Sequence, residues 1–137
     1  MFVADNSLKS VKHYFNDRLK PVFSDREIRM MFQLCAEKRL HITPADLLLS
    51  DQIRMSESDL LFFRSVVKRL LNHEPFQYIH GETEFYGLIL KTDARALIPR
   101  PETEELVDWI VKSQYADMQK IVDVCSGSGC IALALKQ

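Results

Sequence analysis

Apolar positions in the N-terminal half of the chain recur every three or four residues, which is the spacing of one helical face. The pattern predicts helices that begin near Ser7, Ser24, Thr43 and Ser56, all residue types that cap helix N-termini. The first helix is expected to end before Pro21. The expected core positions are Leu8, Val11, Phe15, Leu19, Ile28, Met31, Phe32, Cys35, Leu60, Leu61, Phe62, Phe63, Val66, Val67, Leu70 and Leu71. Amphipathic helices joined by short connections predict a compact bundle over residues 1–73.

The hydrophobic pattern changes at Glu74, where helical spacing gives way to short aromatic and apolar runs. Aromatic and β-branched residues flank Gly87, which favours a β-hairpin within a linker over residues 74–95. Residues 98–101 are expected to be extended, because a residue before proline is pushed out of the helical region. Pro101 can then open a helix. The buried stripe of that helix is expected at Leu106, Val107, Ile110 and Val111.

A strand, a glycine loop and a helix are predicted at the C-terminal end of the sequence. Ile121, Val122 and Val124 are typical of a buried strand in a parallel sheet. A tight turn over residues 126–129 and an apolar helix over residues 131–135 follow. Glycines let a backbone approach a ligand closely, and a helix N-terminus offers free N–H groups. This segment is therefore the strongest candidate for a cofactor site.

Three classes of ligand compete for this loop. A phosphate-binding P-loop needs Gly-Lys-Ser/Thr, and Cys130 stands in the place of that lysine. A dinucleotide site needs Gly-x-Gly-x-x-Gly/Ala, which Gly127, Gly129 and Ala132 satisfy. An S-adenosylmethionine site needs an acidic residue late in the strand, which Asp123 provides before the same two glycines. The loop alone leaves the last two classes open, beside the alternative of a plain turn.

Composition narrows the choice of partners. The 137 residues carry a formal net charge of -1, which gives no global field to attract nucleic acid or a membrane. The three cysteines are odd in number and fit no zinc spacing, so we expect reduced thiols and no metal site. The N-terminus lacks the pattern of a signal peptide, and no apolar run is long enough to span a bilayer. We therefore expect a cytoplasmic protein.

Four short stretches stand out by their order and spacing. They are Glu74-Pro-Phe-Gln-Tyr-Ile-His-Gly81, Phe85-Tyr-Gly87, Leu97-Ile-Pro-Arg-Pro-Glu-Thr-Glu104 and Val122-Asp-Val-Cys-Ser-Gly-Ser-Gly-Cys-Ile-Ala132. Together they resemble the HemK/PrmC family of protein-glutamine methyltransferases. The third stretch is the most specific, because no simple helix or strand rule requires it. The helical half is similar to the family in architecture only.

The resemblance implies a mainly α-helical chain with three parts. These are an N-terminal helix bundle, a linking β-hairpin, and the truncated start of a Rossmann-like α/β methyltransferase domain over residues 96–137. The implied cofactor is S-adenosyl-L-methionine, with Asp123 supporting the loop that lies against the methionine part. The implied loop residues are Cys125, Ser126, Gly127, Ser128 and Gly129. Arg100 and Glu102 would line the same cavity, and Glu102 has the alternative role of a helix N-terminal charge.

One position departs from the family pattern. The family usually has glycine where this chain has Cys125. A Cβ atom and a sulfur must then fit beside the loop, which is expected to require a negative φ. We expect Cys125 to be a small buried residue beside which the cofactor is still accommodated.

The resemblance also implies an activity, the N5-methylation of the Gly-Gly-Gln glutamine in class 1 peptide chain release factors, with the bundle recognising that partner. The family orients the glutamine amide with an Asn-Pro-Pro-Tyr motif, which does not occur in residues 1–137, so no catalytic residue is assigned. We predict that this chain alone binds the cofactor weakly or not at all and transfers no methyl group. We also expect Ile121–Leu135 to be poorly packed. The alternatives are a fragment of a dinucleotide-dependent oxidoreductase and a non-catalytic helical protein-binding module.

Overall fold

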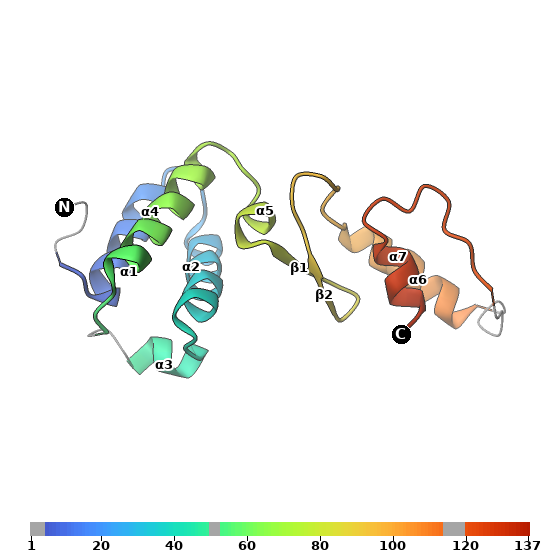
Figure 1. Ribbon diagram of the computed structural model, residues 1–137, viewed down its shortest axis with the longest axis horizontal. Helices are drawn as coiled ribbons and strands as arrows, with labels where there is room; N and C mark the ends of the chain where they lie inside the picture. Colours follow the sequence, from blue (N-terminus) through green and yellow to red (C-terminus); the bar gives the residue numbers. More distant parts are fainter. Residues whose placement is uncertain (1–4, 50–52, 114–119) are drawn as a thin grey trace. The chain divides into compact units, whose positions relative to one another are not determined.

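The computed structural model describes residues 5–49, 53–113 and 120–137 (Figure 1). They belong to two units, Met1–Ile79 and His80–Gln137, each with its own hydrophobic core. The first unit is helical, and the second contains a two-stranded antiparallel sheet and two helices, so the predicted mainly helical fold class is confirmed. Within the described residues, none of the helices combines the length and apolar content needed to cross a membrane.

Four helices make up most of the first unit, and their starts follow the predicted caps. They are α1 (Leu8–Leu19), α2 (Asp25–Leu40), α3 (Pro44–Leu49) and α4 (Glu57–Leu71). Ser24 and Ser56 each accept a hydrogen bond from the backbone three residues on, in complete capping boxes. Thr43 and Asp46 form the same reciprocal pair at the start of α3. A short helix, α5 (Phe76–His80), follows α4, and the hydrophobic pattern did not indicate it.

The core of the bundle is built around packed phenylalanine rings. Phe15 of α1, Phe32 of α2 and Phe63 of α4 are buried, with ring centroids 5.3–6.3 Å apart. Edge-to-face pairs such as Phe15 with Phe32 add to the energy of simple burial. The predicted core is correct except at Leu61, which is 52% exposed. The three long helices are therefore held together by one shared apolar cluster.

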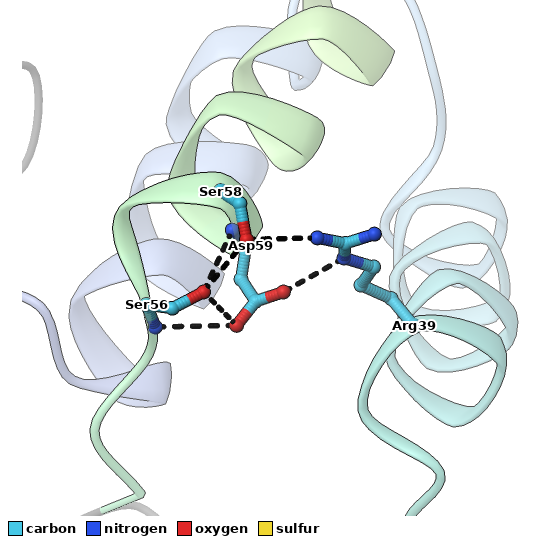
Figure 2. A network of polar contacts seen from close by, with 4 residues as sticks. All are labelled: Arg39, Ser56, Ser58 and Asp59. Atoms are coloured by element: carbon cyan, nitrogen blue, oxygen red, sulfur yellow. Dashed lines mark hydrogen bonds and ion pairs between the residues drawn. The ribbon is translucent and has the colours of Figure 1, made fainter.

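A polar network joins the C-terminal end of α2 to the N-terminus of α4 (Figure 2). Arg39 Nε donates to Asp59 Oδ1 at 2.7 Å, and its Nη2 donates to Ser58 Oγ at 3.0 Å. Asp59 Oδ2 accepts hydrogen bonds from the backbone N–H and the hydroxyl of Ser56. The Arg39 guanidinium also lies over the Phe62 ring, 5.5 Å from its centroid. One carboxylate thus completes a helix cap and an interhelical ion pair.

We expect the substitution Asp59→Asn to destabilise the bundle by about 1 kcal/mol at neutral pH. Partial burial raises the pKa of Asp59, but hydrogen bonds from Ser56 and Arg39 outweigh it and lower the pKa overall. A carboxylate whose pKa is lower in the folded than in the unfolded state stabilises the fold at pH values above its unfolded-state pKa. This stabilisation is lost as the pH falls through the folded-state pKa. The difference between the two proteins in urea unfolding should therefore shrink below about pH 4.

Asp17→Asn is the matched control, because Asp17 makes only an exposed pair with His13 on the same helix. Its effect is expected to stay within about 0.5 kcal/mol. An Asp59→Asn penalty that stays constant down to pH 2 would contradict the electrostatic assignment.

The second unit begins with a tight β-hairpin. Strands β1 (Glu82–Phe85) and β2 (Leu88–Lys91) pair antiparallel, with Phe85 opposite Leu88. Tyr86 and Gly87 form the two-residue turn, both at positive φ (48° and 76°), as a type I′ turn requires. The predicted hairpin around Gly87 is confirmed.

Helices α6 (Pro101–Lys112) and α7 (Cys130–Leu135) pack against each other and contribute to a small core. Residues Phe85, Val107, Cys130 and Ala134 form this core. The predicted start of α6 is correct, with Arg100 extended and Pro101 in the first position. The predicted stripe is wrong at Leu106 and Val111, which are 43% and 46% exposed. Among the described residues, α7 is the helix that packs on α6. Because α7 has only six residues, it covers little of the α6 surface beyond Val107.

The predicted strand at Ile121, Val122 and Val124 does not form. Described residues 120–123 are irregular, and Val122 and Val124 are 82% and 79% exposed. A parallel strand needs a neighbouring strand for its hydrogen bonds, and the strands of the described residues are those of the hairpin. The expectation of poor packing is therefore correct for residues 121–124. It is wrong for Cys130 and Ala134, which are buried.

Candidate functional site

The glycine loop between residues 125 and 129 has the tight, left-handed geometry that its glycines permit. Gly127 and Gly129 have φ of 56° and 73°, a region that residues with a side chain rarely adopt. The Gly129 N–H donates to the Ser126 carbonyl at 2.8 Å, which closes a turn directly before α7. The predicted tight turn is therefore present, with exposed backbone at Gly127 and Ser128.

Cys125 differs from expectation in two respects. Its φ is 64°, where a negative value was expected, and it is exposed, where a buried residue was expected. The difference arises because the chain turns at this residue, and the turn requires a left-handed backbone whichever side chain is present. A non-glycine residue in this region costs roughly 1–2 kcal/mol. Cys125 therefore strains the first turn of the loop.

We expect Cys125→Gly to stabilise the second unit, by up to about 1 kcal/mol once the greater freedom of unfolded glycine is subtracted. Denaturant unfolding followed by the fluorescence of Trp109, the single tryptophan, reports on this unit. Cys125→Ala is the control, because it removes the sulfur and keeps the Cβ at the same φ. Equal gains from glycine and alanine would show that the sulfur, and not the backbone, carries the cost.

Asp123 carries a carboxylate oxygen that the fold leaves unsatisfied. Its Oδ2 is enclosed, and no hydrogen-bond donor among the described residues reaches it. An enclosed carboxylate oxygen without a partner is costly, which makes this position suited to a ligand or to further protein donors. The residue stands two positions before Cys125, at the start of the loop.

A cavity of about 520 Å³ lies against the glycine loop within the second unit. Gly127 and Ser128 contribute the loop side of its wall. The opposite lining comes from the end of β2 and the segment after it, and it consists of Leu90, Lys91, Thr92, Asp93, Arg95, Ala96 and Pro99, with Leu133 of α7 beside them. The volume is within the range of small-molecule sites.

The charged groups of this cavity are unequally engaged. Arg95 binds Asp93 through two guanidinium nitrogens, at 2.9 Å and 2.6 Å. Hydrogen bonds from Arg95 lower the pKa of Asp93 to about 2, so this carboxylate stays ionised and paired. Lys91 makes no ion pair with any described residue. The lining therefore has one more positive than negative charge.

The structure brings together only part of the set of residues expected to bind the cofactor. Gly127 and Ser128 line the cavity, whereas Arg100 and Glu102 are exposed at the start of α6 and do not line it. Their assignment to a cofactor site stays a prediction. Thr92, which also lines the cavity, was not predicted from the sequence. The one indication was its position two residues after Leu90, which places it on the same inward face of the hairpin.

Comparison with known proteins identifies the family of the helical part of the chain. Residues 13–81, half of the chain, match the family model described as PrmC N-terminal domain. The chain belongs to the PrmC N-terminal domain family. The resemblance noted from the sequence motifs is thereby confirmed.

Relatives of this PrmC-family chain extend the match beyond the helical domain. A release factor glutamine methyltransferase of Flavobacterium psychrophilum is 38% identical over 132 residues, which cover 93% of this chain and 46% of the relative. The proteins of that name from Bacteroides thetaiotaomicron and Lactococcus lactis are 33% and 49% identical, over 93% and 61% of the chain and 46% and 31% of their own lengths. The chain thus spans less than half the length of these relatives.

Proposed function

We propose that the protein containing this chain is a release factor glutamine methyltransferase. It transfers a methyl group from S-adenosylmethionine to the glutamine nitrogen of the Gly-Gly-Gln motif in class 1 peptide chain release factors. The observation that carries the proposal is the presence, in one chain, of a PrmC N-terminal domain and an aspartate two residues before a glycine loop. Two relatives that match 93% of the chain are named release factor glutamine methyltransferase, which supports the proposal.

In this proposal the three segments of the chain divide the work. The bundle over residues 1–73 binds the release factor, residues 74–95 link the domains, and residues 96–137 begin the methyltransferase domain. The protein acts in the cytoplasm on a protein partner and needs neither a membrane nor direct contact with nucleic acid.

The residues of the loop fit an S-adenosylmethionine site. Gly127 and Gly129 adopt a positive φ and carry no Cβ, so a ligand can approach the backbone of the loop closely. The unsatisfied Oδ2 of Asp123 is available to support the loop or accept a hydrogen bond from a ligand. Asp123, Cys125, Ser126, Gly127, Ser128 and Gly129 are proposed to hold the cofactor, with Arg100 and Glu102 nearby.

The chemistry explains why the chain contributes binding and no catalytic residue. An amide nitrogen is a poor nucleophile, because its lone pair is delocalised into the carbonyl. The cofactor supplies an electrophilic methyl group, so the protein has to orient the amide toward it, and this orientation can contribute several kcal/mol. We assign that task to an Asn-Pro-Pro-Tyr motif outside residues 1–137.

A methylation assay with the full-length gene product tests the proposal. The expected result is the addition of one methyl group to the Gly-Gly-Gln peptide of a purified release factor, detected by mass spectrometry, and none when that glutamine is replaced. The 137-residue chain alone is expected to transfer no methyl group and to show no micromolar shift with the cofactor. Binding of a nicotinamide dinucleotide in place of S-adenosylmethionine would favour an oxidoreductase instead.

A further inference from the structure

Thr92 is a buried polar residue in the wall of the cavity beside the glycine loop. Only 9% of its surface is exposed, which makes it one of two buried polar or charged residues among those described. Its backbone N–H is used, because it donates to the Gly81 carbonyl at 3.0 Å and extends the hairpin ladder by one pair. Its hydroxyl has no hydrogen-bond partner among the described residues.

The Thr92 side chain lies on the face of the hairpin that borders the cavity. Side chains alternate along an extended segment, so Thr92 shares the face of Leu90, which packs on the small core of the second unit. Thr92 lines the cavity together with Gly127 and Ser128. Its oxygen is not among the fully enclosed unsatisfied atoms, so the accessible part of this buried side chain includes the hydroxyl. A buried hydroxyl without a protein partner is the kind of group that a ligand satisfies.

The lining of the cavity selects the kind of ligand group. Lys91, Asp93 and Arg95 leave an excess of one positive charge, which favours an anion. The lining contains no aromatic ring on which a purine could stack. A carboxylate accepts hydrogen bonds from hydroxyls and backbone N–H groups, and such charge-assisted bonds are stronger than neutral ones.

We infer that the Thr92 hydroxyl donates a hydrogen bond to the carboxylate at the amino-acid end of the methyl donor, in the cavity that Thr92 shares with Gly127 and Ser128. The inference rests on the proposed function and adds a residue that determines how one end of the cofactor is held. The inference assigns the adenosine end of the same ligand to a region outside this cavity, whose lining offers no aromatic ring.

Calorimetric titration of the full-length protein with two ligands tests this inference. S-adenosylhomocysteine carries the amino-acid group, whereas 5′-methylthioadenosine keeps the adenosine and sulfur and lacks that group. Thr92→Val, which removes the hydroxyl and keeps the shape, is expected to weaken the binding of S-adenosylhomocysteine roughly ten-fold. It should leave the affinity for methylthioadenosine unchanged. Thr92→Ser, which keeps the hydroxyl, should restore most of the affinity.

Thr83→Val is the control, because Thr83 lies on β1 of the same hairpin and does not line the cavity. The inference is overturned if Thr92→Val binds S-adenosylhomocysteine like the wild type, or if both ligands weaken equally. It is also overturned if Thr92→Ser is as weak as Thr92→Val. Failure of the wild-type protein to bind S-adenosylhomocysteine at all would instead overturn the proposed function, and this inference with it.

Discussion

Replacing Phe63 by alanine is expected to remove much of the stability of the helical bundle. Phe63 is fully buried on α4, with its ring centroid 5.3 Å from that of Phe32 and 6.3 Å from that of Phe15. Truncation of such a side chain costs about 3–5 kcal/mol, because burial is lost and a cavity remains. Small domains have a total stability of about 5–15 kcal/mol, so the loss removes much of the margin. Urea unfolding followed by far-ultraviolet circular dichroism measures it.

Leu61→Ala is the matched control for this prediction. Leu61 stands two residues earlier on the same helix and is 52% exposed, so its truncation is expected to cost less than about 1 kcal/mol. Helix propensity favours alanine slightly, which reduces the cost further. Similar losses for the two variants would show that Phe63 is not at the centre of the bundle core.

The helix starts were predictable from the sequence because capping is local chemistry. Ser24, Thr43 and Ser56 each satisfy backbone donors within three residues of themselves, so their geometry depends little on the rest of the fold. The core of the bundle was predictable for a related reason, since helical spacing fixes which side chains share a face. Leu61 was the exception, because the apolar stripe of α4 is wider than the surface that α1 and α2 cover.

The second unit was less predictable because its patterns depend on distant partners. The spacing of Leu106 and Val111 and the run at Val122 and Val124 describe surfaces that are suited to burial. Whether they are buried depends on neighbouring strands and helices, which a local pattern cannot supply. The structure therefore confirms the hairpin and the start of α6, whose signals are local, and not the parallel strand.

The candidate site likewise contains one feature that was predictable from local sequence and two that were not. The glycine turn was predictable, because Gly127 and Gly129 mark the positions that need a left-handed backbone. The positive φ of Cys125 was not predictable, because cysteine does not favour this backbone conformation. Thr92 was not either, since a threonine at the end of a strand is ordinary until the cavity beside it is known.

The substitution Gly127→Val is expected to reduce the affinity of the full-length protein for S-adenosylhomocysteine by about 100-fold. The φ of Gly127 is 56°, and a β-branched residue there is a strong outlier that costs roughly 1–3 kcal/mol of strain. Gly127 also lines the cavity, so the added isopropyl group occupies space that the ligand would approach. Strain that displaces the loop from this conformation and occlusion of the cavity both weaken ligand binding, and together they account for the expected loss. Isothermal calorimetry measures the affinity directly.

Gly87→Val separates a general loss of folding from a loss of the site. Gly87 lies in the hairpin turn of the same unit with a φ of 76°, so the added side chain meets a comparable backbone strain away from the cavity. We expect it to lower the thermal midpoint about as much as Gly127→Val while changing ligand affinity by less than about five-fold. If Gly127→Val binds S-adenosylhomocysteine as tightly as Gly87→Val, the glycine loop does not contact the cofactor, and the site must be sought elsewhere. Loss of binding confined to Gly127→Val is the result that the loop geometry predicts.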